Sequence, residues 1–86
     1  MINNEIEDNE ETEELTRSDI IDVINDIKLE AKENHDEYLR DRKNEYYQTT
    51  CQTYYMVLDT IRNRIIMKDR DPADYGLGGD LEKEFL

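Results

Sequence analysis

Residues 18–70 decide the fold, and they read SDIIDVINDIKLEAKENHDEYLRDRKNEYYQTTCQTYYMVLDTIRNRIIMKDR. The stretch contains neither glycine nor proline, the two residues that most often interrupt a helix. Pro72 ends it, and Asp71 is biased away from helical backbone because it precedes a proline. A run of this length without a helix breaker predicts one long helix or a helical hairpin over about residues 18–70.

Apolar side chains recur at steps of three and four residues in both halves of this stretch. The first seam consists of Ile20, Ile24, Ile27 and Ala31, and the second of Tyr47, Cys51, Tyr54, Leu58, Ile61 and Ile65. Such steps place side chains along one stripe of a helix, as in a coiled coil. We therefore expect an all-α, coiled-coil-like fold in which the first helix begins near Thr16 to Ser18, with Ser18 as its N-cap.

A hairpin is the first of two architectures that fit these seams. Its turn is expected at residues 34–36, Asn-His-Asp, because Asn favours the C-terminal end of a helix and Asp the N-terminal end of the next. The helices would then lie near residues 18–33 and 37–69. The second helix would be much the longer, so its seam from Tyr54 onward would need a second chain to cover it.

One continuous helix, paired antiparallel with a second copy about residue 44, is the other architecture. This register aligns Ile24 with Ile65 and Ala31 with Leu58. Each seam of one chain would then be covered by the other seam of its partner. Both architectures require a second chain, so the sequence predicts a homodimer.

The way in which charge is distributed along the chain favours the antiparallel arrangement. The formal charge of −12 arises from 23 acidic and 11 basic residues. Residues 1–15 contribute −7, residues 16–70 only −1 and residues 71–86 contribute −4. The middle part is polarised, acidic over residues 19–37 and basic over residues 40–70, which favours antiparallel pairing of the two halves.

These patterns divide the chain into three parts. Residues 1–15 are expected to form a disordered acidic tail, because they hold too few apolar residues to offset the entropy lost on ordering. Residues 16–70 are expected to form a helical interaction domain. Residues 71–86 read as a flexible, acidic, Gly-containing tail or docking segment, of which residues 81–86 (LEKEFL) suit a last helical turn or a docking peptide.

Carboxylates recur at helical spacing along the first half of the stretch. The members of this acidic row are Asp19, Asp22, Asp26, Glu30, Glu33 and Glu37. On a helix they would line one face with about 4.5–6 Å between neighbours along the axis, a spacing of the same order as that of duplex phosphates. The functional hypothesis is phosphate mimicry, in which this face covers a basic surface of a partner. The alternative is a solvated helix face beside a coiled-coil seam.

Tyrosines cluster in the second half, where Tyr46, Tyr47, Tyr54 and Tyr55 lie within ten residues. Tyrosine is enriched at interfaces because it buries a large area at little entropic cost and keeps a polar tip. These four residues, together with Leu58, Ile61 and Ile65, are therefore candidates for partner binding or for the dimer seam. The same segment is rich in Thr, Tyr and Val, so a strand over residues 46–58 is an alternative.

The sequence predicts no catalytic residue, no metal site and no cofactor, and hence no enzyme. His35 and Cys51 would lie about 24 Å apart on a continuous helix, too far for a catalytic pair. Cys51 is expected to be a small buried hydrophobe on its seam, and His35 a polar residue at a turn or on an exposed helix face. The basic residues near the end of the stretch are expected to be neutralised by the chain's own acidic half; they are Arg62, Arg64, Lys68 and Arg70.

These features predict a small acidic helical protein–protein interaction module, an inhibitor or regulator that occludes a basic surface of a partner protein, including a nucleic-acid-binding surface. The alternative is a structural or scaffolding coiled-coil protein with a C-terminal docking peptide. The net charge argues against direct binding of nucleic acid or an anionic membrane. Lacking a recognisable secretory signal and holding one cysteine, the chain is expected in the cytoplasm. In composition it is similar to small phage and mobile-element proteins.

Overall fold

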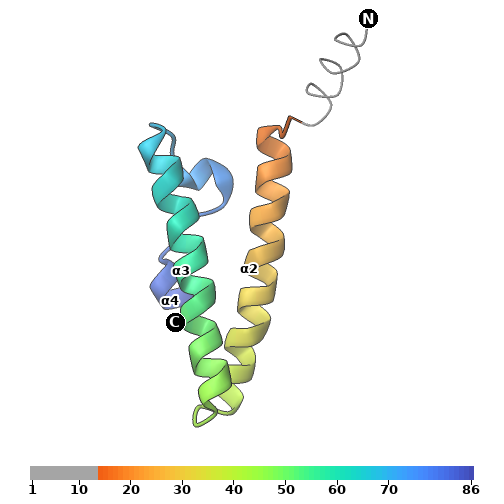
Figure 1. Ribbon diagram of the computed structural model, residues 1–86, viewed down its shortest axis with the longest axis vertical. Coiled ribbons are helices and arrows are strands. Elements are labelled where there is room, and N and C mark those ends of the chain that lie inside the picture. Colours follow the sequence, from red (N-terminus) through yellow and green to blue (C-terminus); the bar gives the residue numbers. More distant parts are fainter. Residues whose placement is uncertain (1–13) are drawn as a thin grey trace, which may run out of the picture.

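The computed structural model describes residues 14–86, and every regular element in this part of the chain is a helix. The elements are α2 (Arg17–Arg40), α3 (Glu45–Met67), the short 3-10 helix η1 (Pro72–Tyr75) and α4 (Leu81–Phe85). Figure 1 shows α2 and α3 as the two antiparallel arms of a hairpin. The all-α prediction and its hairpin form are confirmed, and the Tyr-rich segment is helical. The predicted tail lies outside the described residues, except for its last two.

The hairpin turn lies at Asp41–Asn44, so the turn predicted at residues 34–36 is wrong. The side chain of Asn44 accepts a hydrogen bond from the backbone N–H of Tyr46 at 2.9 Å and thereby caps α3. The backbone N–H of Asn44 donates to the carbonyl of Asp41 at 3.1 Å, which closes the turn. At the end of α2 the backbone N–H of Asp41 donates to the carbonyls of Glu37 and Tyr38. The turn therefore satisfies backbone groups at both helix ends without a glycine.

Residues 34–36 lie within α2 because Asn34 bonds to the neighbouring helix instead of ending its own. Its side-chain amide donates to the carbonyl of Tyr47 at 3.2 Å and to the Cys51 sulfur at 3.3 Å. A polar side chain with partners across a helix interface stabilises the helix that carries it.

The start of α2 also differs from the prediction, which made Ser18 the N-cap. The N-cap is Thr16, whose hydroxyl accepts from the backbone N–H of Asp19 at 3.1 Å. The Asp19 carboxylate in turn accepts from the backbone N–H of Thr16 at 3.0 Å. This reciprocal capping box satisfies two of the free donors at the helix start.

The two predicted seams face each other inside one chain. The two helices have almost equal lengths, 24 and 23 residues, because the turn lies near the middle of the stretch. Ile24 and Ala31 from α2 share one buried cluster with Leu58 and Ile65 from α3. The second seam is thus covered by the first seam of the same chain. The homodimer was predicted because the second seam needed a partner chain to cover it, and this reason no longer applies.

The C-terminal segment completes this core, so the prediction of a flexible segment over residues 71–86 is wrong. Leu77, Leu81 and Phe85 are all buried and belong to the same cluster as the hairpin core. A pair of helices buries only one stripe of each helix, and a chain this short needs a further layer to enclose its apolar groups. The predicted last helical turn is present as α4.

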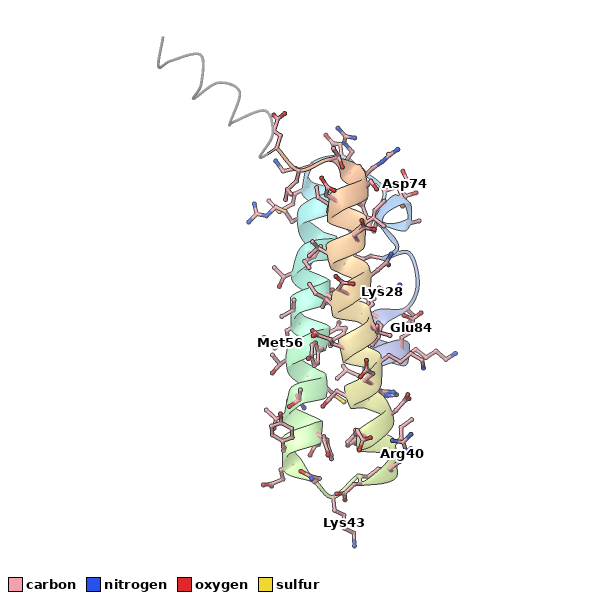
Figure 2. All side chains as sticks on the ribbon, turned by 90° about the vertical axis from the view of Figure 1, so that its right-hand side faces the viewer. Lys28, Arg40, Lys43, Met56, Asp74 and Glu84 are labelled. Atoms are coloured by element: carbon pink, nitrogen blue, oxygen red, sulfur yellow. The ribbon has the colours of Figure 1, made fainter. Side chains whose placement is uncertain are left out.

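Capping groups fix the path of the C-terminal segment along the hairpin. Asp71 accepts from the backbone N–H of Ala73 at 3.0 Å, and Asp80 accepts from that of Lys83 at 3.2 Å. Gly76 adopts a left-handed conformation with φ of 83° between η1 and the following loop, which suits a residue without a Cβ atom. The ammonium group of Lys28 donates to the Gly76 carbonyl at 2.7 Å and ties this loop to α2 (Figure 2).

We expect Phe85→Ala to lower the free energy of unfolding by about 3 kcal/mol or more, because it removes a buried aromatic side chain and leaves a cavity. Phe85 is only 3% exposed, whereas the neighbouring Leu86 is 44% exposed. Leu86→Ala is therefore the matched control and should change stability by less than about 0.5 kcal/mol. Urea unfolding followed by circular dichroism measures both, and equal midpoints for Phe85→Ala and the parent chain would contradict the packed C-terminal segment.

Candidate functional site

The acidic row lies along the outer face of α2. All six members of the row are exposed, while the buried residues Ile24 and Ala31 lie on the opposite side of the helix. From Asp19 to Glu37 the row spans about 27 Å of helix axis, at about 1.5 Å per residue. The helix that carries it packs against the core through Ile24 and Ala31, so the backbone positions of the six residues are fixed relative to one another.

Four members of the acidic row have no cationic partner within residues 14–86. Asp19 belongs to the capping box of α2, and Glu37 pairs with Arg40 at 2.6 Å. No ion pair involves the other four, Asp22, Asp26, Glu30 and Glu33, among the described residues. These four side chains are exposed, so within the described chain nothing covers them.

The two lysines of α2 lie away from this face, on the side where the C-terminal segment packs. Lys28 bonds to the Gly76 carbonyl, and the ammonium group of Lys32 lies 3.9 Å from the Asp36 carboxylate. Steps of four residues place these side chains on a common side of the helix. The C-terminal segment therefore engages one side of α2 and leaves the acidic row uncovered.

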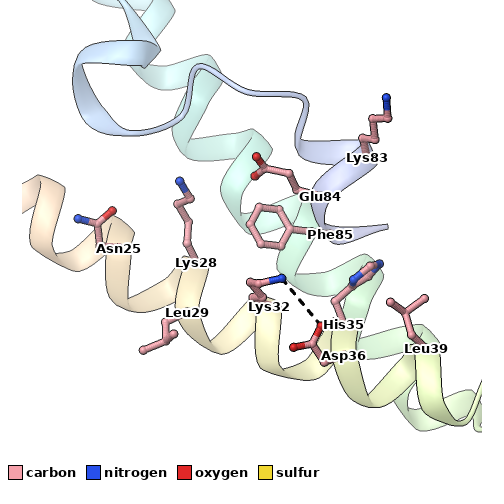
Figure 3. Close-up of a pocket in the computed structure, with 10 residues that line it drawn as sticks. All are labelled: Asn25, Lys28, Leu29, Lys32, His35, Asp36, Leu39, Lys83, Glu84 and Phe85. Atoms are coloured by element: carbon pink, nitrogen blue, oxygen red, sulfur yellow. Dashed lines mark ion pairs between the residues drawn. The ribbon is translucent and has the colours of Figure 1, made fainter.

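A surface groove of about 640 Å³ separates α2 from α4 (Figure 3). The ring of Phe85 reaches from α4 towards α2, and Lys28, Lys32 and His35 line the α2 side. His35 is half-buried within the helix, and its ring centroid lies 6.4 Å from that of Tyr38. Cys51 does not line this groove. No Ser, Thr or Cys side chain lines this groove.

Cys51 is buried on α3, as its position on the seam predicted. Burial raises the pKa of its thiol above the ordinary value, and the hydrogen bond from Asn34 offsets part of this rise. A thiol that is both protonated and enclosed is a poor nucleophile, since the thiolate is the reactive form. Cys51 therefore acts as a small apolar residue of the core.

The candidate tyrosines do not form one surface. Tyr46 is 70% exposed at the start of α3, and its ring contacts that of Tyr47 edge-on at 5.6 Å. Tyr54 and Tyr55 pack against the core cluster and are half-buried. Of the four candidate tyrosines, only Tyr46 is mostly exposed.

The three aliphatic candidates of the predicted dimer seam belong to the core of a single chain. Leu58 is almost completely enclosed and Ile65 is buried with it, while Ile61 packs against them and is half-buried. Leu58 and Ile65 therefore contact their own chain and not a subunit partner. The spacing that identified them as a seam was correct, but the helix they face is α2 of the same molecule.

A cluster of polar side chains, not predicted from the sequence, lies where α3 and α4 meet, and Arg62 belongs to it. Arg62 pairs with Asp59 one helical turn earlier on α3, and both side chains are half-buried. Burial, followed by the nearby carboxylates of Asp59 and Glu82, raises the pKa of the Tyr55 hydroxyl beside this pair. Tyr55, Asp59 and Arg62 lie on successive turns of α3, so their proximity follows from helical spacing. Glu82 joins them only because α4 packs against α3, and no spacing along the chain indicated that contact.

No protein-family model, curated protein or solved structure matches this chain. Within residues 14–86, no three His, Cys, Asp or Glu side chains gather closely enough to hold a metal ion. None of the described helices has the length and apolar character that crossing a membrane requires. The acidic row on α2 stays a candidate site on its own geometry, because all six carboxylates are exposed and four of them have no ion pair within residues 14–86.

We expect Cys51 in the folded chain to react with a thiol-specific reagent at least about tenfold more slowly than in the chain unfolded by denaturant, because its pKa is raised and the reagent is excluded. A matched control carries its single cysteine at exposed Thr53, through Thr53→Cys combined with Cys51→Ala. This control should react at a similar rate with and without denaturant. Equal rates for native Cys51 and the exposed cysteine would contradict a buried structural thiol.

Proposed function

We propose that this protein is a small helical interaction module that acts by covering a basic surface of a partner protein with the acidic face of α2. The observation that carries the proposal is the set of four exposed carboxylates without a cationic partner in the described chain. Fixed charges of one sign steer an oppositely charged protein and set its register on docking. The action is binding without catalysis, which makes the protein an inhibitor or regulator of its partner.

A nucleic-acid-binding protein is the class of partner that fits this face best. The carboxylates follow one another on a packed helix at intervals of about 4.5–6 Å along its axis, of the same order as the roughly 3.4 Å axial spacing of phosphates along one strand of a duplex. Mimicry of phosphates needs charges that are fixed in space, and the core residues Ile24 and Ala31 hold the helix from its opposite side. A partner that neutralises several phosphates on DNA would find several carboxylates within reach of its Lys and Arg side chains.

The position of the C-terminal segment favours this function over a scaffolding role. A docking peptide would need its apolar side chains free for another protein, whereas Leu77, Leu81 and Phe85 are buried against their own hairpin. The same packing leaves the acidic face open. A cytoplasmic setting accords with a partner that binds nucleic acid and with a single reduced cysteine.

We propose the outer face of α3 as the surface through which a second copy would associate. Residues 46–58 carry no charge, and Tyr46 and Met56 on this helix are 70% and 64% exposed. Two chains of net charge −12 repel each other, and the repulsion is smallest where neutral faces meet. This homodimer would replace the one based on the buried seam.

We expect neutralisation of the acidic face to abolish partner binding while the fold persists. The variant Asp22→Asn, Asp26→Asn, Glu30→Gln and Glu33→Gln removes four charges from exposed positions. The immobilised parent chain should retain a basic protein from host extract, and competing duplex DNA should release it. The variant should retain it at least about tenfold less well, with an unchanged circular dichroism spectrum.

The matched control removes four exposed carboxylates from other positions through Glu45→Gln, Asp69→Asn, Asp74→Asn and Glu84→Gln. This control has the same net charge as the acidic-face variant, so it separates a specific face from overall charge. It should retain the partner within about twofold of the parent. Equal losses in both variants, or full retention by the acidic-face variant, would refute the proposed site.

We expect light scattering at tens of micromolar to report a dimer mass for the parent chain and a monomer mass for Met56→Glu, which places a charge on the neutral face of α3. Val23→Glu is the control, since Val23 is 52% exposed on α2, away from that face. It should leave the dimer intact. A monomer mass for the parent chain would rule out the homodimer but leave the acidic-face proposal standing.

A further inference from the structure

A second groove, of about 600 Å³, lies at the open end of the hairpin. α2 and α3 diverge from the turn towards this end (Figure 1). The groove is lined by the first turn of α2, by the end of α3 and the residues that follow it, and by Tyr75 of η1. It is separate from the groove beside α4, and none of the acidic row lines it.

The floor of this groove is apolar. Ile20, Ile61 and Tyr75 line it, and each packs against the core while remaining half-exposed. Ile65 below them is buried. The core therefore does not close at this end, and burial of the exposed apolar surface by a ligand would be favourable.

The rim of the groove is basic. Its charged residues come from the start of α2, the end of α3 and the segment after α3; they are Arg17, Arg64, Lys68 and Arg70. All four are exposed, and none forms an ion pair within residues 14–86. The sequence predicted that the chain's own acidic half would neutralise this region, yet the ion pairs of the described chain satisfy only Arg62 there. Asp69 and Asp71 adjoin Arg70 in the sequence, but no acidic residue of the described chain lines the groove.

We propose that this groove binds an acidic amphipathic segment of a partner protein, with apolar side chains on the floor and carboxylates against the basic rim. This mode resembles the docking of an amphipathic helix into an apolar groove, with specificity added by complementary charge. The groove is an open surface feature between two helices, which suits a peptide better than a small molecule that needs enclosure. The inference is independent of the function proposed for the acidic face.

The net negative charge does not prevent such binding. At physiological ionic strength, charges separated by more than about 8 Å are largely screened, so the nearest groups dominate the interaction. The acidic row faces away from the core, whereas the floor of the groove is part of the core surface. An acidic peptide in the groove therefore meets the four rim cations before it meets the carboxylates of α2.

The test measures binding of a labelled synthetic peptide of four helical turns, with leucines on one face and glutamates on the other, by fluorescence anisotropy at physiological ionic strength. The full chain should bind this peptide saturably. The rim variant Arg64→Gln, Lys68→Gln and Arg70→Gln should bind at least about tenfold more weakly. The control Arg42→Gln, Lys43→Gln and Lys83→Gln removes three exposed cations outside this groove and should stay within about twofold of the parent.

Two altered peptides complete the test. A peptide with lysine in place of glutamate should not bind, and one with alanine in place of leucine should bind at least about tenfold more weakly. Equal affinity of the parent chain and the rim variant, or of the leucine and alanine peptides, would overturn the proposal. A chain lacking residues 1–13 that binds more than about tenfold more tightly than the full chain would also overturn it, by assigning the groove to the chain's own acidic segment.

Discussion

Burial of Leu58, Leu77 and Leu81 in one core is the constraint on which the rest of the structure depends. Leu58 comes from α3, Leu77 from the loop after η1 and Leu81 from α4, and all three are almost completely enclosed. Their contact holds the C-terminal segment against the hairpin, and α2 supplies Ile24 and Ala31 to the same cluster. A chain of this size has little apolar surface to bury, so each of these side chains accounts for a large share of the stability.

This core also separates the charges of the molecule. The C-terminal segment packs on the side of α2 that carries Lys28 and Lys32, which leaves the acidic row on an uncovered face. At the open end of the hairpin the core leaves apolar surface exposed, and four cations surround it. The protein thus presents an exposed acidic row on α2 and a groove with an apolar floor and a basic rim, two surfaces of opposite sign.

The apolar seams and the acidic row were readable from the sequence because both depend only on the period of a helix. The position of the turn was not, because Asp41 and Asn44 are also ordinary residues for an exposed helix face, and Asn34 was an equally good candidate for a helix end. The hydrogen bonds of Asn34 to α3 keep residue 34 inside α2, and these bonds form only when the two helices pack together. The C-terminal segment was misjudged because three glycines and a proline suggested a flexible loop, although Leu81 and Phe85 lie one helical turn apart.

The sequence by itself determined that the chain is helical, which stripe of each helix is apolar and which face of α2 carries carboxylates, since these properties follow from side chains a few residues apart. The tertiary structure alone decided that the seams face each other within one molecule, that the C-terminal segment joins the core and that Arg64, Lys68 and Arg70 surround a groove. These features depend on which segments, distant in the sequence, pack against a given apolar surface. A local pattern shows that such a surface exists, and the packing of the whole chain determines what covers it.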